Sequence, residues 1–194
     1  MSNNLNKSDV CFELLNRRPT SKYQIFIFSE AGSPGSFYRE WTKHLDKYDL
    51  FLIIYPGRLK RTSEKFFTTI KEYIIGFNQR LIPFINKPSI FIGHSIGTVI
   101  NFALAQHMIE TNNKRYLIKL LVEVGRGPPH LPDLLFILYK IYIYKSVDPD
   151  KSFADMNDAE IVESLKKMAD PKTREVYDYP EFVEMLIPML KADA

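Results

Sequence analysis

Four strand-length apolar runs, separated by segments with helical spacing, constrain the fold of this 194-residue chain most strongly. The runs are continuous rather than alternating, which is typical of strands buried on both faces of a parallel sheet. Strands and helices in regular alternation indicate an α/β fold with a mostly parallel sheet. The runs cover residues 23–29, 50–56, 89–95 and 117–125, and the helical segments begin near residues 36, 68 and 97.

The pattern changes after the fourth run. A proline-rich segment, GRGPPHLPD, is followed from Leu134 onward by helical spacing with no further strand. The apolar stretch at 134–145 is interrupted by Lys140 and is too short to span a membrane, so it predicts a buried or substrate-covering helix.

Local signals place two helices in this last third of the chain. Asn157 and Glu160 have the spacing of a capping box, and Pro180 stands at the first position expected for the last helix. Pro188 should bend or end that helix, because proline lacks the backbone N–H and crowds the preceding turn.

Composition narrows the classes of partner and compartment. Lys and Arg number 26 and Asp and Glu 23, a net +3 with only short basic groups such as RLKR at 58–61, which does not favour nucleic acid or a membrane surface. Cys11 is the only cysteine, in a polar N-terminal stretch, so one chain forms no disulfide and no cysteine-rich metal site. The first residues lack the apolar core of a signal peptide, so a cytoplasmic protein without a metal or a membrane span is expected.

The stretch SIFIGHSIGTVI, residues 89–100, places a G-x-S-x-G motif between a predicted strand and a predicted helix. Gly93 and Gly97 lie two residues before and after Ser95, where strand and helix would cross too closely for side chains. The helix starting near Ile96 would direct its free N–H groups toward Ser95. The alternative is a glycine-bounded turn with Ser95 as an N-cap, which the strand-turn-helix context disfavours.

Four motifs together resemble the type II thioesterases, free-standing α/β-hydrolases that serve polyketide and nonribosomal peptide synthases and fatty acid synthesis. The motifs are FSEAGSPGSFYREW at 28–41, YPGR at 55–58, FIGHSIG at 91–97 and MLIPMLKAD at 185–193. The resemblance runs from Tyr23 almost to the end, and implies one α/β-hydrolase domain over 23–194, with a lid at about 130–190, after an extension over 1–22.

The resemblance implies a reaction and its residues. Ser95 would be the acyl-accepting nucleophile, and the backbone N–H groups of Ala31 and Ile96 would form the oxyanion hole. The substrate would be an acyl thioester on the phosphopantetheine arm of an acyl or peptidyl carrier protein. The arm belongs to the carrier, so no cofactor of the chain itself is expected.

The sequence departs from the family pattern beside the oxyanion hole. Glu30 stands where an apolar or aromatic residue is more usual, and Ser33 follows Gly32 where a second glycine is more usual. A carboxylate aimed at a developing oxyanion would oppose catalysis, so Glu30 is expected to face solvent. The YPGR turn is interpreted as structural, with Arg58 solvated.

The base that would activate Ser95 is not evident. The serine, acid, histidine order of this fold leaves only His107 and His130 downstream. His107 lies about 18 Å along the predicted helix, at 1.5 Å per residue, and His130 is better interpreted as lining the mouth of the site. His94 should diverge from Ser95, and His44 falls on an outer helix.

The acid is equally unassigned. Glu123 lies one residue from the position that aligns with the acid of some relatives, Val124, and one residue along a strand reverses the face. Most members that resemble this sequence carry acid and histidine beyond LKAD, so the resemblance implies a truncated form that lacks roughly 40 to 60 residues, since a βαβ unit alone takes about 30. The fourth strand would then be an apolar edge that favours poor solubility or association.

Two other functions stay open on the sequence. The missing base and Glu30 are compatible with a non-catalytic remnant that binds acyl chains or a carrier protein. A lipase or esterase of the same fold is less favoured, because the AGSPGSFYREW and YPGR segments resemble thioesterases specifically.

Overall fold

The computed structural model of the chain describes residues 11–111, 114–125 and 153–194. The chain divides into two compact units, Met1–Pro129 and His130–Ala194. The first unit contains the sheet, and the described part of the second contains helices only.

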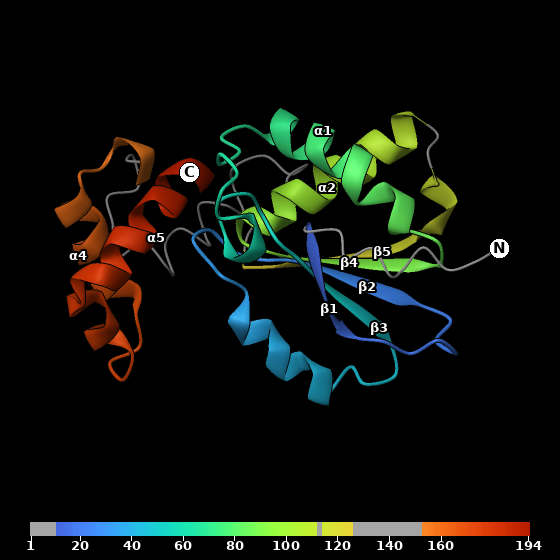
Figure 1. Ribbon diagram of the computed structural model, residues 1–194, viewed down its shortest axis with the longest axis horizontal. Helices are drawn as coiled ribbons and strands as arrows, with labels where there is room; N and C mark the ends of the chain where they lie inside the picture. The colour runs from blue at the N-terminus through green and yellow to red at the C-terminus, as the bar shows by residue number, and fades with distance from the viewer. Residues whose placement is uncertain (1–10, 112–113, 126–152) are drawn as a thin grey trace, which may run out of the picture. The chain divides into compact units, whose positions relative to one another are not determined.

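The first unit is built on a five-stranded sheet (Figure 1). Its strands, in the spatial order β1-β3-β2-β4-β5, are β1 (Phe12–Asn16), β3 (Asp49–Ile53), β2 (Gln24–Phe28), β4 (Ser89–His94) and β5 (Ile118–Val124). The last four are parallel, and β1 is antiparallel to β3. The predicted α/β class with a mostly parallel sheet is therefore confirmed.

Burial differs between the centre of the sheet and its edge. Every residue of β2 and β3 is buried, as their continuous apolar sequences predicted. β5 pairs with β4 alone among the described strands, and Leu120 and Val124 are 51% and 45% exposed. The continuous apolar pattern therefore predicts a strand correctly but predicts its burial only for the centre of the sheet.

The strand β1 was not expected, because the sequence analysis assigned its residues to an N-terminal extension. Phe12 is buried and stacks edge-on against Phe51 at 5.3 Å between ring centroids. Cys11 is fully buried rather than part of a polar surface stretch, and its carbonyl accepts a hydrogen bond from the Ile54 N–H at 2.9 Å. An edge strand needs one buried face only, so its short mixed sequence gave no signal.

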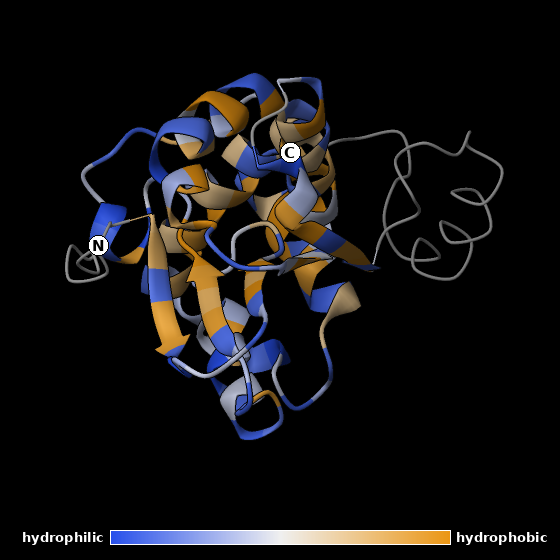
Figure 2. Ribbon diagram, turned by 90° about the vertical axis from the view of Figure 1, so that its right-hand side faces the viewer, coloured by the Kyte–Doolittle hydropathy of each residue, from blue (hydrophilic) through white to orange (hydrophobic). Residues whose placement is uncertain are grey.

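Helices cover both faces of the sheet. α1 (Ile70–Arg80) and α2 (Ile96–Glu110) lie on one face, and the 3₁₀ helix η2 (Ser36–Lys43) lies on the other (Figure 1). The strands carry mostly apolar residues (Figure 2). Burying these residues between the helical layers stabilises the fold through the hydrophobic effect, the dominant favourable term in folding. On the η2 face the buried cluster consists of Ile25, Ile27, Tyr38, Leu50 and Leu52.

The described part of the second unit contains α4 (Asp158–Met168) and α5 (Pro180–Asp193). The capping box of Asn157 and Glu160 is confirmed, and so is Pro180 as the first residue of the last helix. The helix continues through Pro188, which contradicts an end there. Pro188 is exposed, so water can satisfy the carbonyl that loses its partner. The expected helix at 134–145 lies outside the described residues.

The loop after β3 carries the YPGR motif and contains two buried arginine side chains, Arg58 and Arg61. Arg58 is 4% exposed, which contradicts the expected solvated side chain; its guanidinium lies 5.0 Å from the Tyr55 ring centroid. Arg61 is 2% exposed, donates to the Ile54 carbonyl at 2.7 Å and makes two bonds of 2.9 and 2.8 Å to Glu64. A planar fork of donors suits this arrangement, since it satisfies a carbonyl and a carboxylate at once.

Within the described ranges, none of the helices combines the length and the apolar character needed to cross a lipid bilayer.

We expect Arg61→Lys to lower the free energy of unfolding by about 2 kcal/mol, because lysine keeps the charge but cannot make the paired bonds and the carbonyl bond together. Urea titration measures the change. Arg80→Lys is the matched control: Arg80 bonds the same Glu64 at 3.2 Å from a 43% exposed position, where a pair contributes about 0 to 1 kcal/mol. Equal losses in both variants would contradict a special role for Arg61.

Candidate active site

Ser95 occupies a strained turn between β4 and α2. Its backbone angles are φ 54° and ψ −117°, a region that non-glycine residues rarely adopt and that costs on the order of 1 to 3 kcal/mol. The Ser95 N–H donates to the Val124 carbonyl at 2.8 Å, and its carbonyl accepts from the Thr98 N–H and hydroxyl at 3.0 and 2.7 Å. These bonds hold the strained residue on both sides, as expected for a nucleophile elbow.

The two glycines of the motif are required by close backbone contacts. A Cβ at Gly97 would lie 2.1 Å from the Phe28 carbonyl oxygen, at the end of β2. A Cβ at Gly93 would lie 2.6 Å from the Gly97 carbonyl oxygen and from the Thr98 backbone. Backbone atoms cannot yield as the tip of a side chain can, so the start of α2 reaches the sheet only where side chains are missing.

We expect Gly97→Ala to destabilise the first unit by about 3 kcal/mol, the upper end for overpacking, because its methyl group would overlap a strand carbonyl. Urea unfolding measures this. Gly76→Ala in α1 is the control: its Cβ would meet the Phe67 ring at 2.7 Å, and the ring can move. The gain in helix propensity of about 1 kcal/mol should offset most of that cost. Equal effects would show that the crossing is less tight than the structure indicates.

The loop after β2 approaches the elbow because β2 and β4 are neighbouring parallel strands. Phe28 pairs with Gly93, so the segment holding Ala31 and the segment holding Ser95 leave the same edge of the sheet side by side. Tyr55 fixes the start of the first segment by donating its hydroxyl to the Ser29 carbonyl at 3.0 Å. The geometry thus brings the loop of Ala31 next to the N-terminus of α2, where Ile96 is the first helical residue.

Glu30 contradicts the expectation that it faces solvent. Its carboxylate accepts a short hydrogen bond from the Tyr38 hydroxyl, and His94 Nδ1 lies 3.2 Å from the same oxygen. His94 Nδ1 is also 2.9 Å from the Tyr38 hydroxyl oxygen. The physical reason is the register: Phe28 opposite Gly93 places the residues that follow each strand within reach of each other. We call these three side chains the Glu30 network.

The network shifts the ionisation of its acidic members. Burial alone raises the pKa of Glu30, but hydrogen bonds from His94 and Tyr38, its own N–H and Ser33 outweigh burial and lower the pKa from 4.5 to about 2. Burial, the hydrogen bond to Glu30 and the charge of Glu30 raise the pKa of Tyr38 above its usual range. Glu30 is therefore a carboxylate and Tyr38 a neutral donor throughout the physiological range.

This shift predicts a pH dependence of stability. Because folding lowers the pKa of Glu30, its contribution is fully present above about pH 4.5 and is lost as the pH falls toward 2. With the side chain 32% exposed, we expect a contribution on the order of 2 kcal/mol. Urea unfolding of wild type and Glu30→Gln between pH 6 and about 2.5 tests this: the stability difference should shrink with acid. A constant difference would contradict the assignment.

The other candidate bases do not converge on Ser95 in the described residues. His94 directs Nδ1 to Glu30 and Tyr38. His107 lies in the last turn of α2 and His44 caps the end of η2. His130 lies outside the described residues. Over the part of the chain that the structure describes, the elbow and the loop of Ala31 are brought together, but no histidine side chain hydrogen-bonds Ser95.

The register also places Glu123. Gly93 pairs with Glu123 and His94 pairs with Val124, so the Glu123 side chain shares a face of the sheet with Gly93, while Val124 shares the face of His94. The one-residue offset expected from the sequence thus corresponds to opposite faces of β5.

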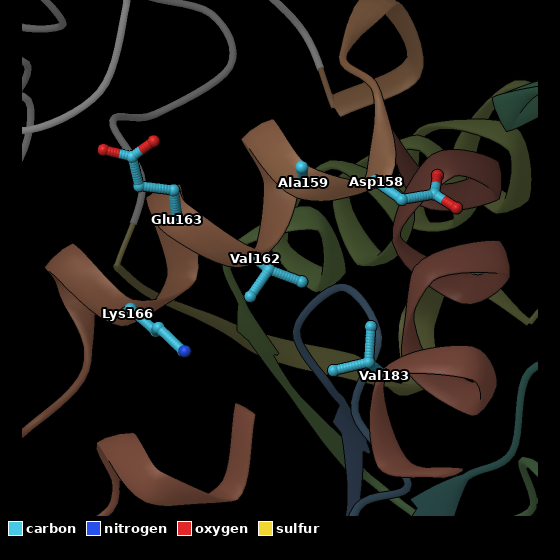
Figure 3. A pocket seen from close by; sticks show the side chains of 6 residues that line it. All are labelled: Asp158, Ala159, Val162, Glu163, Lys166 and Val183. Atoms are coloured by element: carbon cyan, nitrogen blue, oxygen red, sulfur yellow. The ribbon is translucent and has the colours of Figure 1, made fainter. Parts of the chain in front are cut away.

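A separate pocket lies within the second unit (Figure 3). The pocket has a volume of about 450 Å³. Val162 of α4 and Val183 of α5 contribute apolar side chains to its lining. The remaining lining residues are Asp158, Ala159, Glu163 and Lys166. The charged ones are already paired, Asp158 with Lys191 at 2.7 Å and Glu163 with Lys167 at 2.8 Å, and Lys166 with Asp178. The lining contains no serine, threonine or cysteine and its charged groups are paired, so the chemistry is expected at Ser95.

Comparison with known proteins identifies the family of the chain. The model of the thioesterase domain family matches residues 23–131, which include β2 to β5 and the whole motif around Ser95. The chain belongs to the thioesterase domain family. This match spans more than half of the sequence and ends near the boundary between the two units.

Individual relatives of this thioesterase-domain chain are longer than it is. It is 31% identical over 187 residues to linear gramicidin dehydrogenase LgrE of Brevibacillus parabrevis, covering 93% of the chain and 64% of that protein. It is 26% identical over 179 residues to gramicidin S biosynthesis protein GrsT of Aneurinibacillus migulanus, covering 92% of the chain and 63% of that protein. The chain thus spans just under two thirds of these relatives.

A solved structure shares the fold. The type II thioesterase BorB from the borrelidin biosynthetic cluster superposes with a TM-score of 0.70 at 23% identity, over 96% of this chain and 69% of that one. The thioesterase-domain chain therefore has the fold of a type II thioesterase over nearly all of its length.

Proposed function

We propose that the protein is a serine thioesterase of the type II class, which hydrolyses acyl groups carried on the phosphopantetheine arm of an acyl or peptidyl carrier protein. The observation that carries the proposal is the strained Ser95 turn between Gly93 and Gly97, in a chain of the thioesterase domain family. Two relatives, one named for gramicidin S biosynthesis and one for linear gramicidin, support a role in clearing or releasing chains in peptide or polyketide assembly.

The proposed reaction has two steps. The Ser95 Oγ attacks the thioester carbonyl and loses its proton to a base, and the carrier thiol leaves with a proton, which gives an acyl-serine. Water then attacks the acyl-serine, releases the carboxylic acid and restores the serine hydroxyl. In both steps negative charge develops on the carbonyl oxygen.

The N–H groups of Ala31 and Ile96 are proposed to bind that oxygen. Ile96 is the first residue of α2, so its N–H lacks a helical partner and lies at the positive end of the helix dipole. Ala31 follows a strand that neighbours β4. Losing one such donor typically lowers kcat about 10²- to 10³-fold.

The second unit is proposed to be a lid that takes up the acyl chain and the carrier arm. Its described part consists of helices, and α4 and α5 line an open pocket to which Val162 and Val183 contribute apolar surface. A lipid-like acyl chain would be favoured by such a lining, at about 25 cal/mol per Å² of apolar surface buried.

A second candidate is a protein that binds acyl chains or a carrier without hydrolysing them. The observation that favours it is that, in the described residues, no histidine side chain hydrogen-bonds Ser95, since His94 directs Nδ1 to Glu30 and Tyr38. The two candidates differ in one measurable property, the release of free acid.

We expect the chain to release free acid from an acyl group loaded on a carrier protein, and Ser95→Ala to reduce the rate by about 10³-fold or more, because the nucleophile is lost. Mass spectrometry of the carrier measures loss of the acyl group. Ser36→Ala, at an exposed serine outside the elbow, is the control and should keep the wild-type rate. Carrier binding without any Ser95-dependent release would support the binding protein instead.

A further inference from the structure

The Glu30 network joins two segments that the proposed reaction needs to keep in register. Glu30 directly precedes Ala31, and His94 directly precedes Ser95. The third member, Tyr38, is 1% exposed in the cluster on the η2 face, with its ring packed edge-on against Trp41 at 5.2 Å between centroids. Two segments near the reacting groups are therefore tied to one buried side chain.

The donors and acceptors in the network define where the protons lie. An ionised carboxylate only accepts hydrogen bonds, so the Tyr38 hydroxyl uses its single hydrogen on Glu30. His94 Nδ1, 3.2 Å from the carboxylate and 2.9 Å from the tyrosine oxygen, must then carry a hydrogen to bond either of them. The arrangement assigns an Nδ1–H to His94.

The same arrangement resolves the conflict raised by a carboxylate beside an oxyanion hole. One Glu30 carboxylate oxygen, Oε2, accepts hydrogen bonds from both the Tyr38 hydroxyl and His94 Nδ1, so its lone pairs point toward these donors. Charge-assisted hydrogen bonds of this kind are roughly twice as strong as neutral ones, which makes the carboxylate a firm anchor.

We propose that Glu30 is a positioning residue: through Tyr38 and His94 it fixes the loop of Ala31 against the elbow, so that the Ala31 and Ile96 N–H groups converge on one oxygen. The proposal rests on the proposed thioesterase function of the same site. Such positioning matters because the hydrogen-bond donors of an oxyanion hole must be held within about 0.5 Å of the productive geometry.

The variants separate positioning from packing. Glu30→Gln keeps the shape, and its amide oxygen can still accept from Tyr38 and His94, but the negative charge that strengthens both hydrogen bonds is lost. His94→Leu removes the Nδ1 donor, and His94→Asn restores an N–H close to the same place. Glu13→Gln is the matched control, because it makes the same carboxylate-to-amide change in an ion pair with Arg39, at 3.0 Å, outside the network.

The first measurement needs no catalysis. Backbone ¹⁵N relaxation reports order parameters, which are about 0.85 for rigid backbone and below about 0.6 for flexible backbone. We expect rigid values for Ala31 and Ile96 in wild type, Glu13→Gln and His94→Asn. Values should fall toward 0.6 at these two residues in Glu30→Gln and His94→Leu, with β2 and β4 unchanged.

The second measurement reports the oxyanion hole itself. An alkyl boronic acid accepts an oxygen lone pair of Ser95, the hydroxyl proton passes to solvent, and the boron becomes a tetrahedral anion that mimics the reaction intermediate. We expect Glu30→Gln and His94→Leu to bind it about tenfold more weakly, a fraction of the loss of a whole donor. The alkyl amide of the same chain, which forms no bond to Ser95, should bind all variants equally.

The outcomes are distinguishable. Unchanged order parameters and boronic acid affinity in Glu30→Gln and His94→Leu would overturn the positioning role, and so would a general loss of order that includes β2 and β4. Wild-type protein that binds the boronic acid no better than Ser95→Ala would contradict the thioesterase function instead. The order parameters would then still decide whether the network holds the two loops together.

Discussion

The close crossing of α2 over the ends of β2 and β4 is the contact on which the site depends. The start of the helix approaches the Phe28 carbonyl so closely that only hydrogen fits at Gly97, and the same approach leaves no room at Gly93. Bringing the helix in so tightly forces Ser95 into a conformation that costs free energy. The buried centre of the sheet and the hydrogen bonds of Thr98 and Val124 offset that cost, so the strained residue directly adjoins the buried centre of the first unit.

A second layer of organisation lies on the opposite face of the sheet. Residues alternate between faces along β4, so Gly93 meets the helix while His94 meets η2. The elbow is thereby held on both faces of the sheet. Close packing against α2 holds it on one face, and the Glu30 network holds it on the other. Parallel strands make this possible, because they deliver the loops that follow them to one common edge.

The sequence predicted the parallel strands and the elbow well because both depend on local pattern. Continuous apolar runs mark β2 and β3, glycines two residues either side of Ser95 mark the crossing, and Asn157 with Glu160 marks the start of α4. The prediction missed β1, a short edge strand of mixed burial. It also placed Arg58 in solvent, although Arg58 is buried and its guanidinium lies over the Tyr55 ring.

The Glu30 network could not be predicted from the sequence, since it joins residues that are 8 and 64 positions apart and depends on strand register. The unusual carboxylate was visible, but whether it faced water or a partner was a tertiary question. Local rules fail most often where a polar side chain is buried by partners from distant segments, and functional sites are where this is common.

The burial of Cys11 removes the one thiol of the chain from contact with solvent. The sole cysteine lies fully buried just before β1, with its carbonyl bonded to the strand end at Ile54. Its sulfur is shielded from oxidants, alkylating agents and other thiols for as long as that edge strand stays paired, because thiol reactivity requires access. Modification of this sulfur would therefore require the sheet edge to open, so the rate of thiol labelling would measure how often this edge unfolds locally.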